Sequence, residues 1–157
     1  MRMNHLGKLM LTATLAVIVG GSLTAAEKEG EHKAWHHGSL NAICTCENGH
    51  AEVRIDGDTL KLWLVGGGSD TNKAVRIPDK KIVLEITLNG SKTPVEKLTL
   101  TAKPNELAEE NIGDCSQFEG KADWLRRAKL FVGTATIHFK GKSQTLRIEY
   151  PNGYDPD

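Results

Sequence analysis

Histidine and cysteine residues, whose side chains bind transition metals, gather in one short part of the chain. Four of the six histidines and two of the three cysteines lie between residues 32 and 50 of the 157-residue sequence. Imidazole nitrogen and thiolate sulfur bind zinc and copper, and thiolate is especially suited to the cuprous ion. We therefore expect a site for a copper, silver or zinc ion, formed by His32, His36, His37, Cys44 and His50.

The spacing of these residues is loose and matches no zinc-finger pattern. A histidine-rich segment outside the cytosol can nevertheless capture a metal ion without a rigid fold. The alternative is a polar tail that binds no metal, next to cysteines that take part in disulfide chemistry. The residues alone leave both interpretations open.

The cysteines suggest a disulfide as well as a metal site. An oxidising compartment favours disulfide formation, and the chain contains Cys44, Cys46 and Cys115. Cys44 and Cys46 are too close in sequence to pair comfortably with each other. We expect Cys115 to pair with one of them, which leaves one thiol over.

Residues 1–26 have the order of a secretory signal peptide. The positive charges of Arg2 and Lys8 come first, an apolar run over residues 9–19 follows, and small residues lead up to Ala26. The apolar run is about half of the roughly 20 residues that a membrane-spanning helix needs. We expect cleavage after Ala26 and a periplasmic or otherwise exported protein.

The rest of the chain predicts a flexible, histidine-containing lead-in over residues 27–39 and a single β-rich domain over residues 40–157. The lead-in is polar and can bury little surface. With 20 basic and 20 acidic residues, the chain has no charge excess that would favour a nucleic-acid partner. No second apolar run of membrane length follows the signal peptide.

Alternation of apolar and polar residues predicts antiparallel hairpins. Turn residues separate the alternating runs at Asp56-Gly57, Asn89-Gly90 and Gly141. Short helical turns are expected near residues 104–108 and 122–130. The pattern indicates an all-β, mainly antiparallel fold, a small β-sandwich or barrel of about seven strands with a short helix or helical turn.

Motifs for other chemistry are weak. The run Gly66-Gly67-Gly68 lacks the ending of a phosphate-binding loop, so we interpret it as a mobile turn. Asp56-Gly57-Asp58 lacks the later ligands of a calcium loop. Because no nucleophile or acid–base signature is present, we expect that the protein is not an enzyme.

Several segments carry a resemblance that spans nearly the whole chain after residue 26. They are His50-Ala51-Glu52-Val53, residues 65–78, Gly113-Asp114-Cys115-Ser116 and residues 147–157. The chain resembles uncharacterised exported proteins of planctomycete-type bacteria, a group associated with heavy-metal efflux pumps and their periplasmic adaptors. The resemblance implies a histidine near His37 and cysteines at Cys46 and Cys115. It therefore favours a Cys46–Cys115 disulfide over a Cys-x-Cys metal motif.

The residues support one functional hypothesis and leave two alternatives. We expect a periplasmic metal-binding or metal-resistance accessory protein that captures copper, silver or zinc near a component of an efflux system. The main alternative is a non-catalytic periplasmic interaction module that docks on a protein partner without metal. The other alternative is a small-molecule binder or an enzyme, which a concave apolar pocket with convergent polar groups would favour.

Overall fold

The structure, a computed structural model, describes residues 32–88 and 96–156. Its eight strands form one sheet in the order β1-β2-β3-β6-β5-β4-β7-β8, with antiparallel pairing between neighbours. The strands are β1 (Ser39–Ile43), β2 (Thr45–Asp56), β3 (Thr59–Val65), β4 (Lys81–Leu88), β5 (Glu96–Ala102), β6 (Gln117–Lys121), β7 (Phe131–Phe139) and β8 (Lys142–Tyr150).

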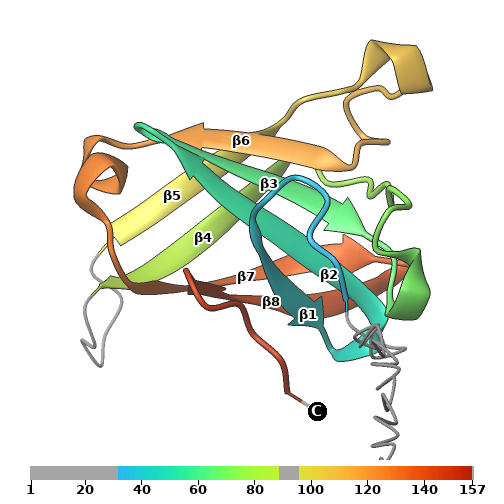
Figure 1. Cartoon of the computed structure of the whole chain (residues 1–157). Helices are drawn as coiled ribbons and strands as arrows, with labels where there is room; N and C mark the ends of the chain where they lie inside the picture. Colours follow the sequence, from blue (N-terminus) through green and yellow to red (C-terminus); the bar gives the residue numbers. More distant parts are fainter. Residues whose placement is uncertain (1–31, 89–95, 157) are drawn as a thin grey trace, which may run out of the picture.

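The sheet curls until its first and last strands lie next to each other (Figure 1). The C-terminal segment after β8 lies along β1, where Tyr154 forms a parallel bridge with Asn41. The backbone of Ala42 donates to the carbonyl of Tyr154 at 2.7 Å. The buried side chain of Asn41 also accepts a hydrogen bond from the backbone of Glu149, at 2.8 Å. The result is a nearly closed barrel, which confirms the predicted all-β class.

Period-two alternation builds the core of the barrel. In β4, buried residues alternate strictly with exposed ones from Lys81 to Ile86. Such alternation places one set of side chains inside a curved sheet and the other set outside. Each strand from β2 to β8 contributes inward residues, among them Ala51, Val53, Leu62, Leu84, Leu100, Phe118, Ile137 and Ile148.

The predicted hairpins at Asp56-Gly57 and Gly141 are confirmed. Asp56 pairs with Thr59 at the end of the β2–β3 hairpin, and Phe139 pairs with Lys142 at the end of the β7–β8 hairpin. Strands β4 and β5 also pair, but the predicted turn at Asn89-Gly90 lies outside the described residues, as does the predicted signal peptide.

Helical structure among the described residues is limited to short 3-10 turns: η1 (Gly68–Asp70), η2 (Glu106–Ala108) and η3 (Asp123–Arg127). The last two fall where the sequence predicts helical turns. In the part of the chain that the structure describes, no helix has the length and apolar character needed to cross a membrane.

Candidate metal centre

A large bulge at the start of β2 creates the candidate site. Thr45 pairs with Ile43 and His50 pairs with Ala42, so one step along β1 corresponds to five steps along β2. Residues 46–49 fill this irregularity. In a regular strand, side chains four residues apart lie about 13 Å from each other. The bulge instead brings the side chain of Cys46 close to that of His50.

Three side chains meet beside the bulge. The ligand atoms of His32, Cys46 and His50 all lie within 4.8 Å of one another. Nδ1 of His32 is 3.1 Å from Nε2 of His50, and the two rings meet edge to face. In a tetrahedral zinc site with bonds of about 2.0–2.3 Å, neighbouring ligand atoms are about 3.3–3.6 Å apart. Small side-chain movements would therefore suffice to hold an ion.

A backbone carbonyl orients the ring of His50. Nδ1 of His50 lies 3.2 Å from the carbonyl oxygen of Gly66. Because a carbonyl only accepts, Nδ1 carries the proton and Nε2 presents its lone pair to His32 and Cys46. Burial, as the largest cause, lowers the pKa of His50 below its usual value, although the Gly66 carbonyl opposes the change. The neutral ring is the form that binds a metal ion.

The glycine run after β3 places this carbonyl. Residues 66–68 pass directly over the bulge, and a side chain at Gly67 would put its Cβ 2.1 Å from the carbonyl oxygen of Glu47. Gly68 has a φ of +55° and lies against the Glu47 carboxylate. Hydrogen bonds from Gly66 to Lys73 and from Asp70 to Gly67 close the loop. The run, interpreted from sequence as a mobile turn, is a close-packed wall of the site.

Glu52 fastens the segment that carries His32. Its carboxylate is fully buried and accepts hydrogen bonds from the backbone of Trp35 at 3.0 Å, His36 at 2.6 Å and Gly38 at 2.9 Å. A buried carboxylate requires such partners. Residues 32–38 therefore lie against β2, in contrast to the lead-in with few contacts that composition predicts. Residues 27–31 lie outside the described part of the chain.

The other expected ligands lie elsewhere. Nδ1 of His36 is 2.9 Å from Glu52, and its ring stacks on Trp63 with 4.3 Å between the centroids. His37 is exposed with a φ of +59°. Cys44 is exposed and its thiol donates to Gln144 at 2.6 Å. Of the five expected ligands, the structure brings together His32 and His50. The third member is Cys46, for which the resemblance implies a disulfide with Cys115.

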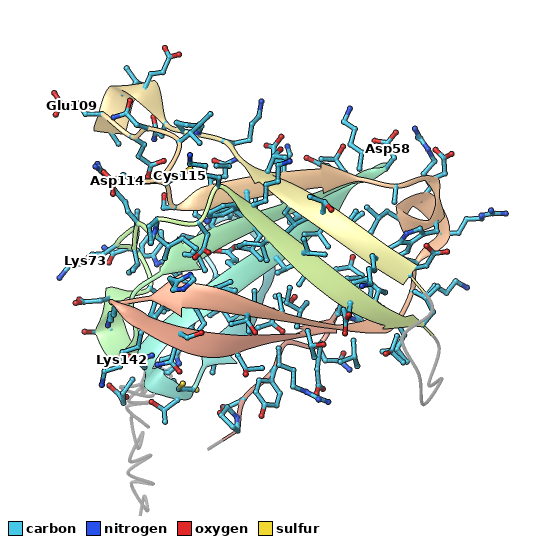
Figure 2. All side chains as sticks on the ribbon, turned by 180° about the vertical axis from the view of Figure 1, so that it is seen from behind. Asp58, Lys73, Glu109, Asp114, Cys115 and Lys142 are labelled. Atoms are coloured by element: carbon cyan, nitrogen blue, oxygen red, sulfur yellow. The ribbon has the colours of Figure 1, made fainter. Side chains whose placement is uncertain are left out.

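The expected Cys46–Cys115 disulfide is not formed. None of the three cysteines, all of which are described, takes part in a disulfide. Cys115 is fully buried, pairs with Ile77 ahead of β6 and donates to the carbonyl of Gln117 at 3.1 Å. Figure 2 shows Cys115 beside Asp114 and well apart from Lys142 at the start of β8. Cys46 has its hydrogen-bond partner in the C-terminal segment instead, at Asp155. Burial raises the pKa of the Cys115 thiol.

A carboxylate completes the surroundings of the three ligands. The thiol of Cys46 donates to Oδ1 of Asp155 at 3.1 Å. Asp155 belongs to the C-terminal segment that closes the barrel beside β1. The sequence gives no local signal for this neighbour, because 109 positions separate the two residues. Together the groups offer two nitrogens, one sulfur and a nearby oxygen.

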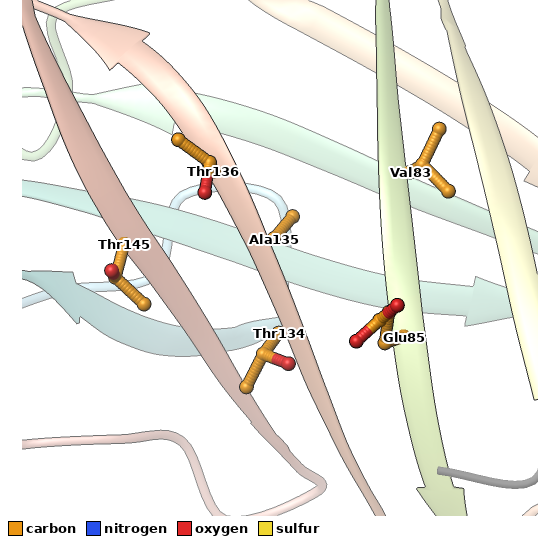
Figure 3. A pocket seen from close by; sticks show the side chains of 6 residues that line it. All are labelled: Val83, Glu85, Thr134, Ala135, Thr136 and Thr145. Carbon is orange, nitrogen blue, oxygen red and sulfur yellow. The ribbon is translucent and has the colours of Figure 1, made fainter.

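A pocket of about 360 Å³ elsewhere lacks such chemistry. It opens between β4 and β7, whose pairing is confined to Glu85–Leu88 and Phe131–Thr134 (Figure 3). Its lining consists of Val83, Glu85, Thr134, Ala135, Thr136 and Thr145. This lining contains one carboxylate and no histidine or cysteine, so it lacks the ligands that a copper, silver or zinc ion prefers. The His32, Cys46 and His50 group is therefore the stronger candidate.

Comparisons with known proteins found no matching family model, no matching curated protein and no matching solved structure.

Proposed function

We propose that the protein binds a copper, silver or zinc ion through His32, Cys46 and His50 as an exported metal-resistance accessory protein. The observation that carries the proposal is the meeting of three soft or borderline ligand atoms within 4.8 Å on a nearly closed barrel. On binding, the Cys46 thiol would release its proton to solvent, and the proton on Nδ1 of the neutral His32 ring would move to Nε2 of the same ring, so that Nδ1 of His32 and Nε2 of His50 both offer lone pairs to the ion. Delivery to an efflux system is the role that the sequence resemblance suggests for such a site.

The composition of the site supports a thiophilic metal. Thiolate and imidazole together suit zinc and copper, whereas calcium and magnesium prefer oxygen ligands. The partly buried setting also supports the proposal, because burial lowers the pKa of His50 and so favours the neutral ring, which is the form that binds a metal ion. The site differs from a flexible histidine tail in that each ligand is held by β2, by the glycine run or by the Glu52 contacts.

Native mass spectrometry and calorimetry with Zn²⁺ and Cu⁺ test the proposal on protein expressed as the full chain and recovered after export. We expect one ion per chain. Cys46→Ser, a change of one ligand atom, should lower affinity at least about 100-fold, beyond the usual cost of changes outside the coordination sphere. Cys44→Ser is the matched control, because it makes the same change two positions away on an exposed thiol.

Alkylation of the cysteines provides an independent test of the same site. Bound metal should protect Cys46 from iodoacetamide and leave the exposed Cys44 reactive. His32→Asn and His37→Asn form a second matched pair, in which only the first should weaken metal binding. Absence of binding by the parent protein, or equal binding by Cys46→Ser and Cys44→Ser, would overturn the proposal.

A second candidate function is docking on a protein partner without metal. The loop before β6 exposes two large apolar side chains, Leu107 at 99% and Ile112 at 65%. Glu110, which lies between them in the sequence, is buried. Its carboxylate accepts a hydrogen bond from the backbone N–H of Asn105 at 3.0 Å and so holds the loop in place. Apolar side chains on a fixed loop are suited to a partner's pocket. Loss of partner recovery in Leu107→Ser, with metal binding intact, would favour this function.

Export is part of the proposed function. N-terminal sequencing of protein from the periplasmic fraction should begin at Glu27, since the signal-peptide order of residues 1–26 predicts cleavage after Ala26. An intact Met1 on protein confined to the cytosol would contradict it.

A further inference from the structure

A pocket of about 370 Å³ adjoins the candidate metal centre. Small-molecule sites usually have volumes of about 300–1,000 Å³, so this pocket matches a ligand of amino-acid size. Three parts of the chain form its walls: the segment before β1, the bulge of β2 and the loop after β3. Its lining includes His32, Lys33, Trp35, Glu47, Ser69 and Asn72.

His32 belongs to both the metal centre and the pocket. Its ring is partly exposed, whereas Cys46 and His50 are buried. A zinc ion with three protein ligands keeps a fourth position for water or another ligand. A molecule held in the pocket would reach the ion from the side of His32.

The pocket walls carry opposite charges and a flat apolar surface. Lys33 contributes an ammonium group, which lies 4.7 Å from the centre of the Trp35 ring, and Glu47 contributes a carboxylate. The indole of Trp35 is 50% exposed. Ser69 and Asn72 add uncharged hydrogen-bonding groups. This combination is complementary to a zwitterion with a planar or soft side chain.

We propose that the pocket binds an amino acid with a metal-binding side chain, such as histidine, as an additional ligand of the bound ion. The inference rests on the proposed metal site. The carboxylate of the ligand pairs with Lys33, its ammonium group pairs with Glu47, and its imidazole nitrogen occupies the remaining position on the metal. The protein then takes up its ion together with a small ligand rather than as the bare ion.

The test adds L-histidine to the zinc-loaded protein and follows the complex by native mass spectrometry and calorimetry. We expect a protein–zinc–histidine complex, with binding to the metal-free protein at least about tenfold weaker because the coordinate bond is lost. Imidazole, which lacks both charges, serves as the probe for coordination alone. Lys33→Gln should lower the affinity for histidine about fivefold and leave the affinities for imidazole and zinc within about twofold.

Asn72→Trp fills the pocket from its exposed rim and provides a second variant. It should abolish the histidine complex while the protein keeps its zinc. Removal of zinc by histidine without a ternary complex would overturn the inference, as would histidine binding that neither variant changes. Failure of the parent protein to bind either Zn²⁺ or Cu⁺ before histidine is added would overturn the proposed function itself, so the two failures are distinguishable.

Discussion

The thiol of Cys46 donates a hydrogen bond to Oδ1 of Asp155 across 3.1 Å and so joins the bulge of β2 to the C-terminal segment. The neighbouring Tyr154 donates its backbone N–H to the carbonyl of Leu40 at 3.1 Å and accepts from Ala42 at 2.7 Å. The contacts that close the barrel beside β1 therefore also place a carboxylate next to the thiol. Barrel closure and the candidate metal centre share one segment.

Asp155→Asn should lower the affinity for zinc about 10- to 100-fold, the usual cost of losing a group that orients or supports a ligand. The change keeps the size of the side chain and removes its negative charge. That charge would stabilise a bound cation, so its loss should weaken binding. Calorimetry with Zn²⁺ provides the measurement. Glu96→Gln, which removes one charge from an exposed position at the start of β5, is the control. Equal affinities in both variants would exclude a role for the Asp155 carboxylate.

Glu52→Gln should lower the free energy of unfolding by about 2–3 kcal/mol, because an amide in a buried position cannot replace the hydrogen bonds that the carboxylate accepts. The affinity for zinc should fall as well, since the segment that carries His32 loses its attachment to β2. Urea unfolding and zinc calorimetry measure the two effects. Glu85→Gln, an exposed carboxylate on β4, should change neither. A stable variant with weakened zinc binding would separate the two roles of Glu52.

Gly67→Ala should lower the free energy of unfolding by about 1–3 kcal/mol, the range seen when an added methyl group has no space. The new Cβ would lie 2.1 Å from the Glu47 carbonyl oxygen, so the loop must move away from the bulge. That movement also shifts the Gly66 carbonyl from His50, and zinc affinity should fall. Ser69→Ala, at an exposed position in the same loop, should stay within about 0.5 kcal/mol of the parent. If Gly67→Ala is as stable as the parent, the loop can move away from the bulge at little cost in free energy.

The sequence predicts the barrel well because its strands alternate. In β4 and in β7–β8, apolar residues recur with period two and a turn residue interrupts the pattern, so strand type and hairpin partner follow from local residues. The short β6 (Gln117–Lys121) is harder to predict. Its five residues include Gly120, which lies where a Cβ would come 2.6 Å from the carbonyl oxygen of Thr99. Such a strand is defined by its neighbours rather than by its own pattern.

The grouping of side chains at the candidate metal centre is predicted only in part. The gathering of histidines and cysteines indicates a site, but regular strand geometry would keep Cys46 and His50 about 13 Å apart. Only the bulge, a feature of the pairing between β1 and β2, unites them. The burial of Glu52 is also not predictable from local sequence. Alternation along β2 places this residue on the outer face of the sheet, where a side chain is expected to contact solvent. The segment before β1 covers that face, and local sequence carries no sign of this contact.

The buried Glu110 makes the stability of the loop before β6 depend on pH. Burial alone would raise the pKa of Glu110, but hydrogen bonds from the Ser116 hydroxyl and the Asn105 backbone outweigh it, and the pKa lies below its usual value of 4.5. A carboxyl group whose pKa is lower in the folded state contributes stability that is complete above the unfolded pKa. This contribution disappears as the pH falls through the folded pKa. The parent should therefore lose stability as the pH drops below about 4.5.

Glu110→Gln should be less stable than the parent at pH 7 and approach the parent's stability as the pH falls toward 3. Urea unfolding at pH 7, 4.5 and 3 measures the difference between the two proteins, which cancels the effect of the other carboxylates. Ser116→Ala should give an intermediate result, because it removes one of the hydrogen bonds that lower the pKa of Glu110. Glu96→Gln should follow the parent at every pH. A difference between parent and Glu110→Gln that is constant with pH would mean that Glu110 stabilises the loop by its shape and not by its charge.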